Sequence, residues 1–171
     1  MKILITYFSK TGNTEKVAKS IKDGLVGQDI DLKPVKDVDP SSLTNYDLIF
    51  LGSGIYASRV NKSIPDLVNT AQYLPQKFVF FSTHASSDNY QDGFKLVKRK
   101  LEKINSTIIG EFDCMGENIG IPKAKIESML DKLPLEKRKE AEKHQKRLKG
   151  RPNEEDLENA KRFAQAFVKK L

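Results

Sequence analysis

The chain has 171 residues, of which 38% are hydrophobic and 31% are charged, and its net charge is +7. This length and composition suit one folded domain, residues 1–171, with enough apolar side chains for a buried core, and they exclude a disordered chain. The apolar runs have the length of strands, so we expect no segment that crosses a bilayer.

Strand-like and helix-like patterns alternate along the chain. In chain order, we expect strands at 3–8, 30–35, 47–52, 78–83 and 107–112, and helices at 14–25, 64–73, 92–104 and from 154 onward. The runs at 47–52 (DLIFLG) and 78–83 (FVFFST) are almost entirely apolar, which is typical of strands covered on both faces. This order predicts an α/β fold, a doubly wound five-stranded parallel sheet with helices on both faces.

Three of the helices have a clear apolar face. The inward residues that we expect are Val17, Ala18, Ile21 and Leu25 on the first, Phe94, Val97, Leu101 and Ile104 on the third, and Leu157, Ala160, Ala164, Phe167, Val168 and Leu171 on the last. Asn153 can cap the last helix, whose first turn is acidic.

Residues 115–150, which we call the extension, are too many for an ordinary connection between a strand and a helix. We expect a short helix near 123–130 and a polar one at 135–148 that buries little. Residues 123–151 hold eleven Lys/Arg and five Asp/Glu, a net of +6, and no aromatic residue. We therefore expect no nucleic-acid partner. A solvated helical face is the plainer interpretation, and a docking surface for an acidic protein or an anionic membrane is the sharper one.

The chain contains one cysteine, Cys114, and two histidines far apart in sequence, His84 and His144. We therefore expect no internal disulfide and no zinc site. Cys114 is expected to be a buried, inert thiol, and His144 to be solvated among charged neighbours. Residues 1–4 lead directly into the first strand, so we expect no signal peptide and a cytoplasmic protein.

The segment Ser9–Thr14 (SKTGNT) joins the first strand to the first helix. The first N–H groups of a helix have no partner within it and carry partial positive charge, so a hydroxyl-rich turn here predicts an anion site, with phosphate favoured. Ser9, Thr11 and Thr14 can donate hydroxyl hydrogen bonds, and Asn13 can cap or donate. An ordinary helix cap is the alternative interpretation. We expect Lys10 to point into solvent.

Other phosphate chemistries do not match this segment. It has one glycine where a dinucleotide fingerprint needs three, and the chain lacks G-x-x-x-x-G-K-[ST]. The first and third strands do not end in the acidic residues of a phospho-accepting receiver, and no cysteine stands in the first loop as in a low-molecular-weight phosphatase. The interpretation that remains for this segment is a site for the terminal phosphate of a ligand. The loops at 53–59 and 84–92 follow strands at the same edge of the sheet and offer Tyr56 and Tyr90 beside polar atoms. These aromatic residues indicate a site for a flat ring between the two loops. A ligand with a terminal phosphate and a flat ring predicts FMN.

The motifs LITYFSKTGNTEKVAKSI, GSGIYAS and STHASS resemble those of the flavodoxin family over residues 1 to about 114, together with the last helix. The resemblance implies that the FMN phosphate is bound by Ser9, Lys10, Thr11, Gly12, Asn13 and Thr14. It implies that the isoalloxazine ring lies between Ser53, Gly54, Ile55, Tyr56 and Ala57 on one side and Thr83, His84, Ala85 and Ser86 on the other. Tyr56 is expected to stack on the ring. In the third loop the ring contact is left open between His84, Ala85 and Tyr90, and His84 is equally well interpreted as a solvated loop residue.

Two features depart from the family pattern. Electron carriers of the family often have glycine after the stacking aromatic residue, where this chain has Ala57, which resists positive φ. The family is usually acidic, whereas this chain is basic. We therefore expect a less stable one-electron-reduced flavin and a less negative reduction potential than in typical carriers.

The resemblance implies an FMN-binding redox protein that exchanges electrons with a partner protein or a small-molecule donor or acceptor. One alternative is an FMN-dependent quinone or NAD(P)H oxidoreductase, including an enzyme similar to the flavodoxin-like protoporphyrinogen dehydrogenase. The other alternative is a flavin-free interaction module, whose working surface would be residues 123–151.

Overall fold

The computed structural model describes residues 1–86, 88 and 90–168. Five parallel strands form the sheet in the order β2-β1-β3-β5-β6, and the short β4 pairs antiparallel with the end of β3. Their bounds are β1 Lys2–Phe8, β2 Asp29–Pro34, β3 Leu48–Tyr56, β4 Arg59–Val60, β5 Lys77–His84 and β6 Thr107–Met115. The structure confirms the doubly wound parallel sheet and adds β4, which the sequence did not predict.

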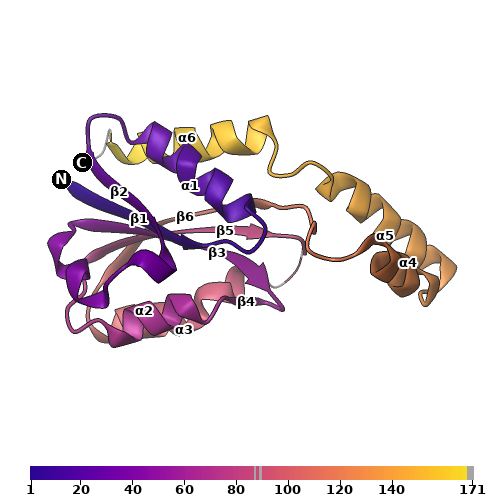
Figure 1. Ribbon diagram of the computed structural model, residues 1–171, viewed down its shortest axis with the longest axis horizontal. Helices are drawn as coiled ribbons and strands as arrows, with labels where there is room; N and C mark the ends of the chain where they lie inside the picture. The colour runs from indigo at the N-terminus through magenta and orange to yellow at the C-terminus, as the bar shows by residue number, and fades with distance from the viewer. Residues whose placement is uncertain (87, 89, 169–171) are drawn as a thin grey trace.

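Helices cover both faces of the sheet (Figure 1): α1 (Asn13–Gly24) and α6 (Glu154–Val168) lie on one face, and α2 (Ser63–Thr70) and α3 (Lys95–Lys103) lie on the other. Short 3-10 helices span Val35–Asp37, Pro40–Asn45 and Gln91–Phe94. Because side chains alternate along a strand, Leu48 and Phe50 of β3 pack toward α1 and α6, whereas Ile49 and Leu51 pack toward α2 and α3. All four are buried, which explains the continuous apolar run.

The helix predicted at 92–104 begins with the 3-10 turn before α3. Phe94, Val97 and Leu101 are buried as expected, but the expectation for Ile104 was wrong. Ile104 is exposed because α3 ends at Lys103, before this side chain can turn inward.

The packing of α1 on α6 depends on small residues. Val17, Ala18, Ile21 and Leu25 are fully buried as predicted, together with Ala160 and Ala164 of α6. A Cβ atom at Gly24 would lie 2.3 Å from the carbonyl oxygen of Lys161, so only glycine permits this approach of the two helices.

The predicted cap of α6 is confirmed. The Asn153 side chain accepts a hydrogen bond from the Asp156 N–H group (3.0 Å), and the Asp156 carboxylate accepts one from the Asn153 N–H group (2.9 Å). Leu157 and Phe167 pack beside Ala160 and Ala164 as predicted. The side chain of Val168 and all of Leu171 lie outside the described residues.

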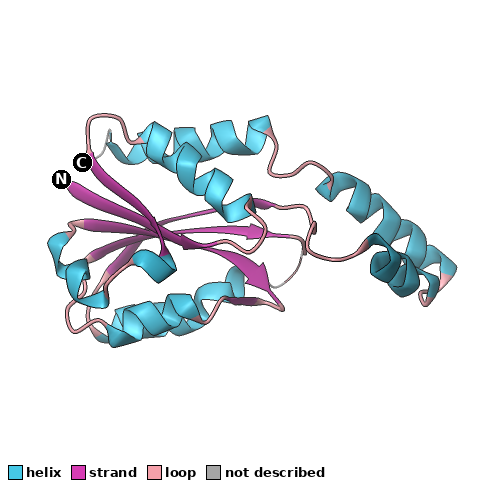
Figure 2. Cartoon of the chain, in the orientation of Figure 1, coloured by secondary structure: helices cyan, strands magenta, loops and turns pink. Residues whose placement is uncertain are grey.

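The extension contains two helices, α4 (Lys123–Asp131) and α5 (Leu135–Leu148), close to the predicted ranges. They form a hairpin that projects beyond the carboxyl ends of the strands (Figures 1 and 2). Every side chain of α4 is at least partly exposed, and on α5 only the last residue, Leu148, is buried within the described chain. Nowhere in the described ranges is a helix long and apolar enough to cross a membrane.

Candidate functional site

The strand order reverses at β1, because the chain places β2 on one side of β1 and β3 on the other. In sheets of this kind ligands bind beyond the carboxyl ends of the strands at such a reversal. A cavity of about 720 Å³ lies there, within the usual range for small-molecule sites. Its walls are the loop before α1, the end of β3, the loop after β5 and the extension.

The loop between β1 and α1 presents the start of a helix to this cavity. Gly12, at φ 89°, turns the chain into α1, and its N–H group donates a hydrogen bond to Ser9 Oγ (3.1 Å). Within the described residues, no side chain caps α1, so the hydroxyl groups of this loop do not serve as an ordinary helix cap. Thr11 and the exposed Lys10 line the cavity beside the helix start, which fits an anion site.

Two other residues of the loop are committed to contacts within the protein. Thr14 is buried, and its Oγ1 lies 2.8 Å from Thr83 Oγ1 at the end of β5. The Asn13 side-chain amide donates a hydrogen bond to the Glu117 carbonyl oxygen (2.9 Å), which ties the loop to the extension. Both residues line the cavity, but each already has a partner for one polar group.

Tyr56 stands at the end of β3 and reaches back over the loop before α1. Its hydroxyl accepts a hydrogen bond from the Lys10 N–H group (3.3 Å), and its ring meets Phe8 edge-on, with centroids 6.0 Å apart. Burial raises the pKa of Tyr56 above its ordinary value. The ring is partly exposed and lines the cavity, where an aromatic surface can pack on a flat ligand.

The turn after Tyr56 differs from expectation. Ala57 has φ 47° and Ser58 has φ 62°, so the expectation that Ala57 would resist positive φ was wrong. Two successive residues with positive φ match the right-handed twist of a tight hairpin, and here they join β3 to β4. Ser53 stabilises this hairpin, since its Oγ accepts a hydrogen bond from the N–H group of Asn61, the residue after β4 (3.2 Å).

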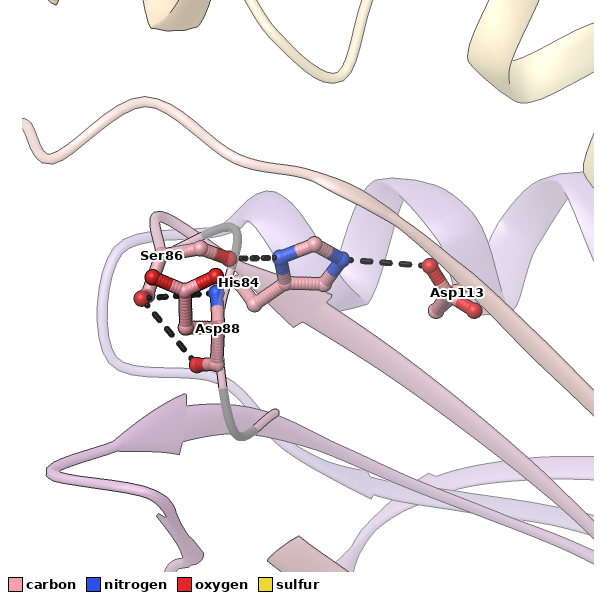
Figure 3. A network of polar contacts seen from close by, with 4 residues as sticks. All are labelled: His84, Ser86, Asp88 and Asp113. Carbon is pink, nitrogen blue, oxygen red and sulfur yellow. Dashed lines mark hydrogen bonds and ion pairs between the residues drawn. The ribbon is translucent and has the colours of Figure 1, made fainter. Parts of the chain in front are cut away.

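The buried His84 is hydrogen-bonded to exposed partners in the polar network of Figure 3. Its Nδ1 is 2.6 Å from the Ser86 carbonyl oxygen, and its Nε2 is 3.1 Å from Asp113 Oδ2. Its ring stacks on Tyr90 with a centroid distance of 3.8 Å and an interplanar angle of 3°. With 5% of its surface exposed, His84 is not a solvated loop residue, and both ring nitrogens face protein oxygens. His84 therefore stabilises the loop after β5 through its contact with Ser86.

Asp113 of β6 completes this network and was not anticipated from the sequence. Its negative charge, followed by burial, raises the pKa of Tyr90. The neighbouring Cys114 is buried, and burial raises the pKa of its thiol to about 12, so the expectation of an inert thiol is confirmed.

The extension supplies the remaining wall of the cavity. His144, Gln145 and Leu148 of α5 line it, as do several residues between 116 and 121. The Nε2–H group of His144 donates a hydrogen bond to the Ala85 carbonyl oxygen, because a carbonyl can only accept. The prediction that His144 is solvated was therefore wrong.

The structure brings most of the predicted site residues to one cavity. They are Lys10, Thr11, Asn13, Thr14, Gly54, Ile55, Tyr56, Ala57, Thr83, His84, Ala85 and Ser86. Ser9, Gly12 and Ser53 are not among the lining residues, but the hydrogen bonds from Gly12 to Ser9 and from Asn61 to Ser53 support the backbone beside it. In the described part of the chain, His, Cys, Asp and Glu side chains form no group of three that could hold a metal ion.

Comparisons with known proteins agree with this geometry. A family model described as a flavodoxin domain matches residues 4–165. An uncharacterized protein of Methanocaldococcus jannaschii is 34% identical over 171 residues, which cover 99% of each chain. The flavodoxin-like domain-containing protein BilS of Clostridioides difficile is 28% identical and covers 98% of this chain, with 97% of its own length matched. The crystal structure of oxidised Flavodoxin 1 from Bacillus cereus has the same fold, with a TM-score of 0.68, 18% identity, and coverage of 100% of this chain and 99% of its own.

Proposed function

The chain belongs to the flavodoxin family, and from that premise we propose that it binds FMN in the cavity and transfers electrons through it. The observation that carries this proposal is the start of α1, which opens onto a cavity of about 720 Å³ without a side-chain cap among the described residues. Uncapped N–H groups and a positive helix end suit a phosphate group. The proposal therefore places the phosphate at Thr11 and the first turn of α1.

The residues around the rest of the cavity fit a flat ring. Tyr56 offers an aromatic face on one side, and the loop from Thr83 to Ser86, braced by His84, offers backbone and small side chains on the other. When bound, FMN supplies the redox chemistry, and the protein supplies binding, orientation and electrostatics. The partner in this proposal is a redox protein or a small-molecule electron donor or acceptor.

An FMN titration of the purified, flavin-free protein tests this proposal, with flavin fluorescence as the signal. Thr11→Val removes a hydroxyl from the cavity wall, and a hydrogen bond to a charged phosphate contributes about 1.5–3 kcal/mol. We expect the Kd for FMN to rise about 10- to 150-fold. The matched control, Thr44→Val, changes an exposed threonine of the 3-10 helix that precedes β3, at the opposite edge of the sheet, and should bind FMN normally.

Protein that takes up no FMN would refute the proposal and favour a flavin-free interaction module. If Thr11→Val binds FMN with normal affinity, Thr11 does not contact the phosphate, and the proposed phosphate site is wrong.

A second candidate is an FMN-dependent quinone or NAD(P)H oxidoreductase. The observation in its favour is the wall formed by His144, Gln145 and Leu148, which encloses more of the cavity than the three strand-end loops do alone. An enclosed space beside a flavin can hold a small substrate. Steady turnover of NAD(P)H with a quinone by the FMN-loaded protein would favour the oxidoreductase, and electron exchange with protein partners alone would favour the carrier.

A further inference from the structure

We propose that the free end of the α4–α5 hairpin docks on the surface of an anionic lipid bilayer. We call this end the hairpin tip and define it as Met129, Leu133 and Leu135 with Lys125, Lys132 and Lys139. This proposal goes beyond FMN binding and does not depend on it, because no residue of the hairpin tip lines the cavity.

The apolar part of the hairpin tip is open to solvent. Met129 is 57% exposed, Leu133 is 38% exposed and Leu135 is 69% exposed. They lie at the end of α4, in the turn and at the start of α5, which Figure 1 shows as the part of the hairpin farthest from the sheet. Three large apolar side chains exposed within seven residues of a protruding end make this end a candidate interaction surface.

Lysines stand near these side chains, in a segment that also holds Glu127, Asp131 and Glu136. Lys125 and Lys132 stand four residues before and three residues after Met129, and Lys139 stands four residues after Leu135. These spacings place each lysine beside the apolar residue on the helical surface or its immediate continuation. All three lysines are exposed, and no carboxylate among the described residues pairs with them.

The arginine of this region is occupied within the protein. Arg138 pairs with Asp131 (2.8 Å) and with Glu142 (2.9 Å), so it stabilises the hairpin instead of facing a partner. The cations that remain available at the hairpin tip are therefore lysines.

A lipid surface fits this composition better than an acidic protein does. Protein interfaces are enriched in aromatic residues and arginine and depleted in lysine, and residues 117–151 contain no aromatic residue. An anionic bilayer attracts each nearby lysine without requiring a fixed geometry, and lysine can keep its charge at the headgroups while its stem lies along apolar groups. Exposed leucine and methionine side chains can then enter the interface beside those lysines.

Vesicle flotation of the full-length protein tests the proposal. The probes are vesicles of phosphatidylcholine and vesicles of phosphatidylcholine with phosphatidylglycerol in equal parts. We expect the protein to float with the anionic vesicles and to remain behind with the neutral ones. Two variants, Leu133→Ser with Leu135→Ser and Lys132→Gln with Lys139→Gln, should each bind the anionic vesicles about tenfold more weakly or worse.

The matched control lies on α3. Leu96 is 61% exposed, and Lys95 and Arg99 are exposed beside it, so Leu96→Ser with Lys95→Gln and Arg99→Gln makes similar changes away from the hairpin. This control should float like the unmodified protein, and because all the substituted side chains are exposed, circular dichroism should show the same fold in every variant.

Three outcomes would overturn the proposal. They are equal binding to neutral and anionic vesicles, equal losses in the control and the tip variants, and binding to poly-glutamate with no flotation on either vesicle. The last outcome would assign the surface to an acidic protein instead.

Discussion

Replacing His144 with alanine tests whether the extension forms part of the FMN site. His144 and its hydrogen-bond partner, Ala85, both line the cavity, and the bond joins α5 to the loop after β5. A hydrogen bond between neutral groups contributes about 0.5–1.5 kcal/mol net. If FMN binds with α5 in this position, His144→Ala should raise the Kd for FMN about 2- to 13-fold.

The assay is the fluorescence titration with FMN, run on two further variants. His144→Gln keeps an N–H donor and should retain most of the affinity. Lys143→Ala changes the preceding residue on α5, which is exposed and does not line the cavity, so its Kd should match that of the unmodified protein.

The reasoning fails if His144→Ala binds FMN as tightly as the unmodified protein, because α5 would then contribute nothing to the site. It also fails if Lys143→Ala causes the same loss, because the effect would then belong to the helix and not to the bond with Ala85. Thermal unfolding of each variant shows whether the fold is preserved.

Lys10→Gln should lower the reduction potential of bound FMN, because it removes a positive charge from the cavity wall. For a charge pair about 10 Å apart, the energy is about 0.4–1.7 kcal/mol, or about 20–70 mV, at an effective dielectric of about 80–20. The control Lys77→Gln, at the opposite end of the sheet, should not change the potential, since salt screens charges beyond about 10 Å. Equal shifts of the potential in the two variants would refute an effect of the Lys10 charge. Tyr46→Phe should lower the free energy of unfolding by about 0.5–1.5 kcal/mol at pH 7, measured by denaturant titration. The hydrogen bond from Tyr46 lowers the pKa of Asp31 in the folded protein. The stabilisation is therefore present above the unfolded pKa of about 4 and is lost as the pH falls through the lower folded pKa. A stability difference between Tyr46→Phe and the unmodified protein that persists at acid pH would contradict this reasoning. Gly24→Ala should destabilise the protein by about 1–3 kcal/mol because its Cβ would overlap the α6 backbone, and an unchanged melting temperature would disprove that contact.

The parallel sheet was predictable because its central strands are buried on both faces. A run such as Leu48–Leu51 leaves no polar position for a solvated face, and the helices between the runs carry their own apolar stripes. The end of β3 was less predictable. The loop expected at 53–59 is partly strand, since β3 continues to Tyr56. The hairpin was missed because the turn at Ala57 and Ser58 has positive φ without the glycine that usually signals such a turn.

The site was predictable where backbone geometry defines it and unpredictable where single side chains complete it. The start of α1 follows from the strand, turn and helix order around Gly12. His144 contacts the cavity through one hydrogen bond to a backbone carbonyl, which requires no pattern in the sequence. Asp113 pairs with His84 only because β5 and β6 are neighbours, a pairing that depends on the sheet order.

The extension is joined to the rest of the protein at points that also shape the cavity. Glu117 connects its two ends, since its N–H group donates to the Arg151 carbonyl oxygen (2.8 Å) and its carboxylate accepts from the Gly150 N–H group (2.7 Å). The Glu117 carbonyl oxygen accepts a hydrogen bond from Asn13, and His144 donates one to the Ala85 carbonyl oxygen. Arg151 also pairs with the capping carboxylate Asp156 (3.3 Å), so the base of the extension is tied both to the cavity and to the start of α6. Glu117 and His144 therefore connect the extension to different strand-end loops of the cavity, through Asn13 and Ala85.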